Sequence, residues 1–148
     1  MTIELGPLIM GALGGIGSWF LTQGVTEPLR RFFEMRRDII EHLLDTLNVP
    51  ATHDATTGEP TKRNVSDQDL ARLREAERKC RQLGTKLLSF YQTDFVAKHL
   101  LRWCWRYDVL KAGRALIGLS NNLSLYGAAR KEHRQDIHTA LGIKDLVP

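Results

Sequence analysis

Cysteine is scarce in this sequence, with only Cys80 and Cys104 in a chain of 148 residues. Small domains stabilised by disulfides carry several cysteines at regular spacings, so a disulfide framework is not expected here. Both cysteines lie in hydrophobic stretches with helical spacing. We therefore expect two reduced, buried thiols.

The sequence also lacks the short motifs that support catalysis or nucleotide binding. It has no CxxC pair, no serine nucleophile elbow, no paired catalytic carboxylates and no GxxxxGK[ST] loop. A GxGxxG pattern begins at Gly15, but Phe20 occupies the position of its third glycine. His133 and His138 are five residues apart, whereas a zinc-binding helix spaces its histidines four apart. We expect no enzyme activity, metal, cofactor or small-molecule substrate.

Alternating β-branched residues are absent too, whereas leucine, arginine and alanine are plentiful. Apolar residues recur instead at steps of three and four, which predicts amphipathic helices over residues 26–48, 66–92, 95–119 and 123–141. Thr26 and the pair Ser66 and Asp69 suit helix N-termini, and Gly142 suits a helix C-cap. The predicted fold is all-α, with an antiparallel bundle of about four helices in residues 27–148 and a flexible loop over 49–65.

Charged residues are missing from Leu5 to Val25, LGPLIMGALGGIGSWFLTQGV. About 20 apolar residues in a helix span the hydrocarbon core of a bilayer, and Trp19 lies where such a helix would leave it. The sequence therefore predicts a transmembrane anchor over residues 1–26. Gly11, Gly14, Gly15 and Ser18 form two small-xxx-small pairs, which favour close packing between membrane helices and a homo-oligomer.

Basic residues follow this stretch closely, at Arg30, Arg31, Arg36 and Arg37. Lysine and arginine near a membrane span stay in the cytoplasm. We therefore expect a single-pass protein of the inner (cytoplasmic) membrane, with its N-terminus outside and the bundle in the cytoplasm.

The predicted helix over 95–119 has two apolar stripes. One contains Val96, Leu100 and Trp103, and the other contains Leu101, Trp105 and Val109. Such a helix is central in a bundle or is packed between the bundle and another surface. Its aromatic residues point in different directions, which argues against stacking on nucleic acid. We expect a surface contact with the bilayer that comprises Lys98, Arg102, Trp105 and Arg106.

These patterns favour a membrane-anchored interaction or scaffold protein that self-associates or recruits a protein partner. A first alternative is a pore-forming or holin-like membrane effector, in which several copies of the glycine-rich helix assemble. A second alternative is a soluble helical regulator whose residues 5–25 are buried in an oligomer. An enzyme with an unrecognised site is a third.

Overall fold

The chain forms an all-α structure, as predicted. The computed structural model describes residues 15, 18–19, 21–49, 52–54, 66–126 and 128–144. In these residues the α-helices are α2 (Glu27–Asp45), α3 (Asp67–Thr93), α4 (Phe95–Cys104), α5 (Val109–Asn122) and α6 (Ala128–Leu141). A π-helical turn, η1 (Thr22–Thr26), precedes α2, and a 3-10 turn, η2 (Thr46–Asn48), follows it.

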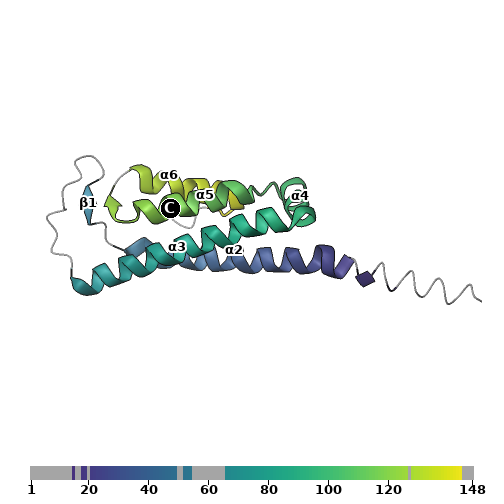
Figure 1. The fold of residues 1–148 in the computed structure, drawn as a ribbon. Coiled ribbons are helices and arrows are strands. Elements are labelled where there is room, and N and C mark those ends of the chain that lie inside the picture. The colour runs from purple at the N-terminus through teal and green to yellow at the C-terminus, as the bar shows by residue number, and fades with distance from the viewer. Residues whose placement is uncertain are drawn as a thin grey trace, which may run out of the picture.

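Of the four longer helices, α2, α3, α5 and α6, each runs antiparallel to the next one in the chain (Figure 1). The short helix α4 and the turn η1 lie side by side at one end, which we call the α4 end. At the opposite end, β1 (His53–Asp54) pairs in parallel with β2 (Leu125–Tyr126). The core between the helices contains leucine and alanine together with Phe32, Ile39, Cys80, Phe90, Val109 and Ile137.

Helices α3 and α5 approach each other closely at Gly84 and Gly113. A Cβ atom at Gly84 would lie 2.9 Å from the Gly113 carbonyl oxygen and 2.9 Å from Cγ1 of Ile117. A Cβ atom at Gly113 would lie 2.9 Å from Cδ2 of Leu88. The absence of side chains at this pair lets the two helix backbones approach each other.

Helices α2 and α6 are joined by arginines that cap each other's C-terminal ends. Arg36 of α2 donates hydrogen bonds to the carbonyls of Leu141 (2.9 Å) and Gly142 (3.2 Å). Arg134 and Arg130 of α6 donate to the Thr46 carbonyl at 2.8 and 2.9 Å. Guanidinium groups satisfy carbonyls that a helix end leaves without partners, and their positive charge suits the helix dipole.

His42 is a buried titratable group between α2 and α3. Its Nε2 lies 3.1 Å from the Ala76 carbonyl oxygen, which fits a neutral ring donating from Nε2. Burial is the main cause that lowers the pKa of His42, and the charges of Lys79 and Arg134 act in the same direction. The Ala76 contact and Asp45 oppose them.

We expect this burial to make the bundle less stable in mild acid. The unfolded chain binds a proton at His42 near an ordinary pKa of about 6.5, whereas the folded chain resists that proton. The contribution of His42 is therefore complete above that pKa and is lost as the pH falls below it. Melting temperatures at pH values on either side of it should fall less in His42→Gln than in the natural chain. Equal losses would contradict this assignment.

Two predicted helix termini are confirmed. The Ser66 side chain accepts from the Asp69 backbone N–H at 3.1 Å, and Asp69 returns a contact to the Ser66 backbone N–H, which completes a capping box. Gly142 has φ +57°, and the Ile143 N–H donates to the His138 carbonyl at 2.9 Å. That bond closes α6 with the geometry of a Schellman cap.

The start of α2 differs from the prediction. Thr26 makes no cap hydrogen bond, because η1 continues directly into α2. Pro28 lacks a backbone N–H, and its ring clashes with the carbonyl four residues earlier, so the helix widens at this point instead of starting anew. The hydrogen bond from the Glu27 N–H to the Thr22 carbonyl belongs to this wider turn.

The helix predicted over 95–119 is two helices, α4 and α5, separated by residues 105–108. Arg106 has φ +59°, outside helical geometry. The Asp108 side chain accepts from the Lys111 N–H at 3.0 Å and starts α5 as an N-cap. Periodicity alone missed the break because apolar spacing continues through it.

Three further expectations need correction. Helix α5 extends to Asn122, and α6 begins at Ala128, with β2 between them, so the last helix starts later than predicted. The expected loop over 49–65 includes β1, with the Thr52 N–H donating to the Ser124 carbonyl at 2.9 Å. Cys80 is buried, but Cys104 is exposed at the end of α4.

In the described residues, no helix is both long and apolar enough to cross a membrane. The predicted transmembrane helix is therefore not seen in this part of the chain. Much of Leu5 to Val25, including Gly11 and Gly14, lies outside the described residues.

Candidate functional site

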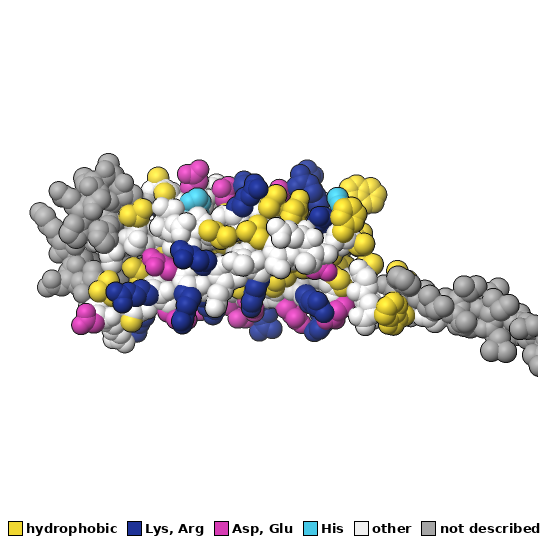
Figure 2. Space-filling model, viewed as in Figure 1, with side chains coloured by type: hydrophobic (Ala, Val, Ile, Leu, Met, Phe, Trp, Pro, Cys, Tyr) yellow, Lys and Arg dark blue, Asp and Glu magenta, His cyan; other side chains and the backbone are white. Residues whose placement is uncertain are grey.

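The α4 end carries most of the exposed large hydrophobic side chains of the described residues. Figure 2 shows hydrophobic side chains gathered over α4 and near the start of α2, while the face along α3 is studded with charged groups. Among the side chains that the structure describes, only Leu44 and Leu47 of this kind lie elsewhere, near the C-terminus of α2. The members of this α4-end surface are Trp19, Leu21, Phe33, Phe95, Val96, Trp103 and Trp105.

Helix α4 turns one side to the bundle and another away from it. Ala97 and Leu101 are buried against the core. Trp103 is 86% exposed and Val96 is 49% exposed. The break after Cys104 leaves α4 at the end of the bundle, where neighbouring helices cover only one of its apolar sides.

A cluster of aromatic rings packs between the core and this surface. Phe32 of α2 is fully buried, with its ring 5.8 Å from that of Phe90 and 5.7 Å from that of Tyr107. The neighbouring Phe33 meets Trp105 edge to face at 5.7 Å. The cluster joins α2, α3 and the segment after α4, so it fixes where the exposed rings lie.

Basic side chains at the border of α4 make contacts within the chain. The Lys98 ammonium lies 4.6 Å from the ring centre of Tyr91 and 5.0 Å from that of Phe95. Arg102 pairs with Asp108 at 2.9 Å, and both side chains are at least partly exposed. Helix α4 itself contains no Asp or Glu, so its charge is positive.

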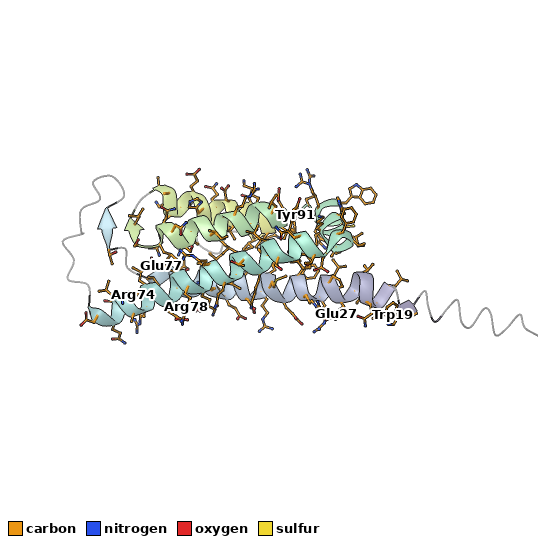
Figure 3. All side chains as sticks on the ribbon, viewed as in Figure 1. Trp19, Glu27, Arg74, Glu77, Arg78 and Tyr91 are labelled. Carbon is orange, nitrogen blue, oxygen red and sulfur yellow. The ribbon has the colours of Figure 1, made fainter. Side chains whose placement is uncertain are left out.

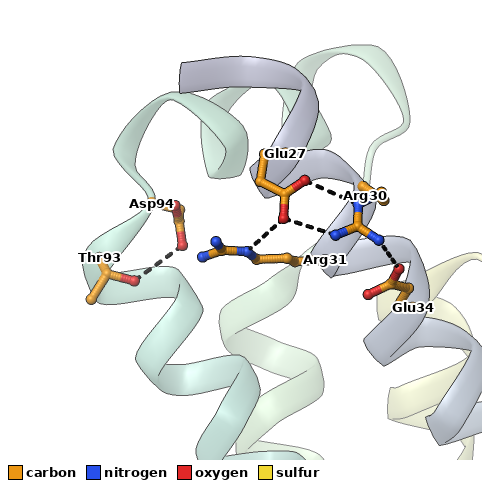
Figure 4. Close-up of polar contacts among 6 residues, drawn as sticks. All are labelled: Glu27, Arg30, Arg31, Glu34, Thr93 and Asp94. Atoms are coloured by element: carbon orange, nitrogen blue, oxygen red, sulfur yellow. Dashed lines mark hydrogen bonds and ion pairs between the residues drawn. The ribbon is translucent and has the colours of Figure 1, made fainter. Parts of the chain in front are cut away.

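The start of α2 is held by exposed ion pairs. Glu27 accepts hydrogen bonds from Arg30 (3.0 and 2.9 Å) and Arg31 (3.2 Å), and Arg30 also reaches Glu34 at 2.7 Å (Figure 4). Arg30, together with Arg31, lowers the pKa of Glu27 to about 2. The carboxylate therefore stays charged across the physiological pH range.

Figure 3 places Trp19 and Glu27 near the start of α2, with Tyr91 toward the α4 end of α3. Arg74, Glu77 and Arg78 lie toward the opposite end of α3. The exposed aromatic surface is therefore separate from this mixed charge on α3.

The four predicted juxtamembrane arginines make different contacts in the structure. Arg30 and Arg31 pair with Glu27, and Arg37 pairs with Glu41 at 2.9 Å. Arg36 is half-buried and turned onto the end of α6, where its guanidinium also lies 5.4 Å from the ring centre of Tyr107. Its side chain is held by protein atoms and does not point freely away from the bundle.

Of the predicted membrane-packing residues, the structure describes two. Gly15 and Ser18 are both exposed, and a Cβ atom at Gly15 would meet nothing within 4 Å. No contact within the described residues accounts for a glycine at this position.

The predicted surface contact of Lys98, Arg102, Trp105 and Arg106 is assembled only in part. Trp105 lies against Phe33 and is 43% exposed. Lys98 lies over the rings of Tyr91 and Phe95, and Arg102 is paired with Asp108. Trp103 and Val96 lie on the first of the two predicted apolar stripes, and in the structure this stripe faces outward at both residues. The presence of two separate apolar stripes on the predicted helix was the available signal that one of them faces outward.

No chemical site emerges among the residues that the structure describes. They contain no group of three or more His, Cys, Asp or Glu side chains placed to hold a metal ion. Burial raises the pKa of the Cys80 thiol to about 11, so this thiol is a poor nucleophile. The α4-end surface is therefore the leading candidate for function.

Comparisons of this chain with protein-family models, with curated proteins and with solved structures found no match.

Proposed function

We propose that this protein is a membrane-anchored helical scaffold, in which the N-terminal stretch tethers the bundle and the bundle self-associates or recruits a protein partner. One observation supports it most: the exposed aromatic surface lies at the end where the uncharged stretch joins the bundle. Turn η1 lies beside α4, and Trp19, just before it, is 60% exposed. Tryptophan prefers the boundary between membrane and water.

The orientation in this proposal follows from the four arginines after the stretch. The retention of Lys and Arg on the cytoplasmic side depends on these residues themselves, and nearby Asp and Glu contribute little. The ion pairs of Arg30, Arg31 and Arg37 therefore leave the inference intact. The bundle is placed in the cytoplasm, where a tether raises the effective concentration of a bound partner at the membrane.

Packing between anchors is the proposed route to self-association. Gly15 and Ser18 are open to a neighbour, and small residues let membrane helices approach closely. Gly11 and Gly14 belong to the same predicted surface.

Fractionation of the full-length chain tests the anchor directly. We expect the protein to stay with membranes through an alkaline carbonate wash, because a spanning helix is not released with peripheral proteins. A chain that begins at Thr26 is the comparison and should leave the membrane fraction while remaining helical by circular dichroism. A full-length chain found in the soluble fraction would overturn the anchor and favour the oligomeric regulator in which residues 5–25 are buried.

A further inference from the structure

The outward side of α4 is an apolar surface without a partner in the described structure. Val96, Leu100 and Trp103 are spaced by four and three residues, so they lie on one side of the helix. With Phe95, His99 and Arg102 they line a shallow surface hollow of about 530 Å³. A contiguous exposed apolar surface of this kind indicates a site of interaction.

We infer that α4 lies in the headgroup region of the bilayer as a second membrane contact, with its Val96 and Trp103 side facing the lipid. This inference rests on the proposed function, because the N-terminal stretch brings the bundle to the membrane. It adds an orientation: the bundle is held with its α4 end against the bilayer instead of swinging on a single tether.

Position is the first argument for lipid as the partner. Leu5 to Val25 contains no charged residue, and its last residues enter η1 beside α4. Trp19 and Leu21 lie near the end of this stretch, just before η1, and are 60% and 65% exposed. If the bilayer holds this stretch, α4 therefore lies close to the membrane surface.

Composition is the second argument. Interfacial helices combine aromatic and aliphatic residues on one side with lysine and arginine at the border. Helix α4 has Phe95, Val96 and Trp103 facing outward, Lys98 and Arg102 beside them, and no acidic residue. Arg102 is paired with Asp108, so Lys98 is the α4 charge that suits anionic headgroups, and the tryptophan suits the boundary between headgroups and acyl chains.

Size is the third argument, and it disfavours a second copy of the chain as the main occupant. Helix α4 has ten residues and is about 15 Å long. One side of so short a helix is small beside the roughly 800 Å² that each partner buries in a standard protein interface. Binding of a helix at the membrane interface instead scales with the apolar area buried, so it needs no surface of that size.

Tryptophan fluorescence in the full chain tests the inference. Two variants each keep one tryptophan, Trp103 in Trp19→Phe/Trp105→Phe and Trp19 in Trp103→Phe/Trp105→Phe. Both are reconstituted into vesicles of phosphatidylcholine and phosphatidylglycerol, with or without bromine on the acyl chains. We expect bromine to quench both tryptophans. Trp103 should be quenched more strongly by bromine near the headgroup than by bromine near the chain end.

The two variants separate the failure of this inference from failure of the anchor. Quenching of Trp19 without quenching of Trp103 overturns the α4 contact and leaves the anchor standing. Failure of either variant to float with vesicles overturns the anchor and the α4 contact together. Blue-shifted Trp103 emission without bromine quenching, growing with the protein-to-lipid ratio, shows that a second copy covers α4 and overturns the lipid contact.

A matched pair of variants checks that the contact belongs to α4. In the variant that keeps Trp103, Phe95→Ser with Val96→Ser should increase quenching of Trp103 by water-borne acrylamide in vesicles. Leu44→Ser with Leu47→Ser changes two exposed leucines of 41% exposure near the other end of α2 and should leave that quenching unchanged. Equal effects of the two pairs would contradict a specific role for α4.

Discussion

Replacing Phe32 by alanine should lower the free energy of unfolding by about 3–5 kcal/mol, the range for truncating a buried phenylalanine. The ring is fully buried and lies among those of Phe33, Phe90 and Tyr107. Its loss leaves a cavity where α2 meets the end of α3 and the segment after α4. The total stability of a domain is typically about 5–15 kcal/mol, so this single change removes a large share. Denaturant unfolding followed by circular dichroism measures the loss.

Phe33→Ala is the matched control for this prediction. Phe33 is the next residue, but it is 38% exposed and packs on Trp105 from outside the core. We expect a loss of about 1 kcal/mol, because less apolar area returns to water and no sealed cavity forms. Similar losses for the two variants would show that the aromatic cluster is not the core contact described here. Phe32→Ala should also loosen the α4 end, which a rise in acrylamide quenching of Trp105 would report.

Replacing Gly84 by valine should destabilise the bundle by about 3 kcal/mol, at the upper end of the range for overpacking. The new Cβ atom would come within 2.9 Å of the Gly113 carbonyl oxygen, which is backbone and cannot swing away. Helices α3 and α5 would have to separate, and they share the most extensive contact in the structure. Thermal unfolding of the full chain should show a clear drop in melting temperature.

Alanine variants at two other glycines provide comparisons for the loss of stability expected at Gly84. Gly113→Ala would press mainly on the Leu88 side chain, which can move, and its Cβ atom would lie 3.3 Å from the Gly84 carbonyl oxygen, so its loss should be smaller. Gly24→Ala meets nothing within 4 Å and should be neutral or slightly stabilising, because alanine is the better helix former by about 1 kcal/mol. A Gly84 variant as stable as the Gly24 variant would contradict the close crossing of α3 and α5.

Local signals in the sequence were sufficient for much of the fold. The three- and four-residue spacing predicted the helices, because each amphipathic helix must bury one side. Ser66 with Asp69 and Gly142 marked helix ends because their contacts involve only neighbouring residues. The break between α4 and α5 could not be found this way. It depends on Arg106 at a positive φ and on the Asp108 cap, while the apolar spacing continues through both.

Composition and local periodicity were enough to predict the all-α class, the antiparallel bundle of about four helices and the uncharged N-terminal stretch. Which apolar side chains are covered depends on how the helices pack together. The tertiary structure buried Leu101 and left Trp103 outward, because α4 ends the bundle and has neighbours on one side only. It also turned Arg36 onto the end of α6, since the carbonyls left open there come from a helix far away in the chain. The exposure of a side chain and its contacts with distant parts of the chain depend on which helices pack together. Residue spacing within a single helix does not specify which helices these are.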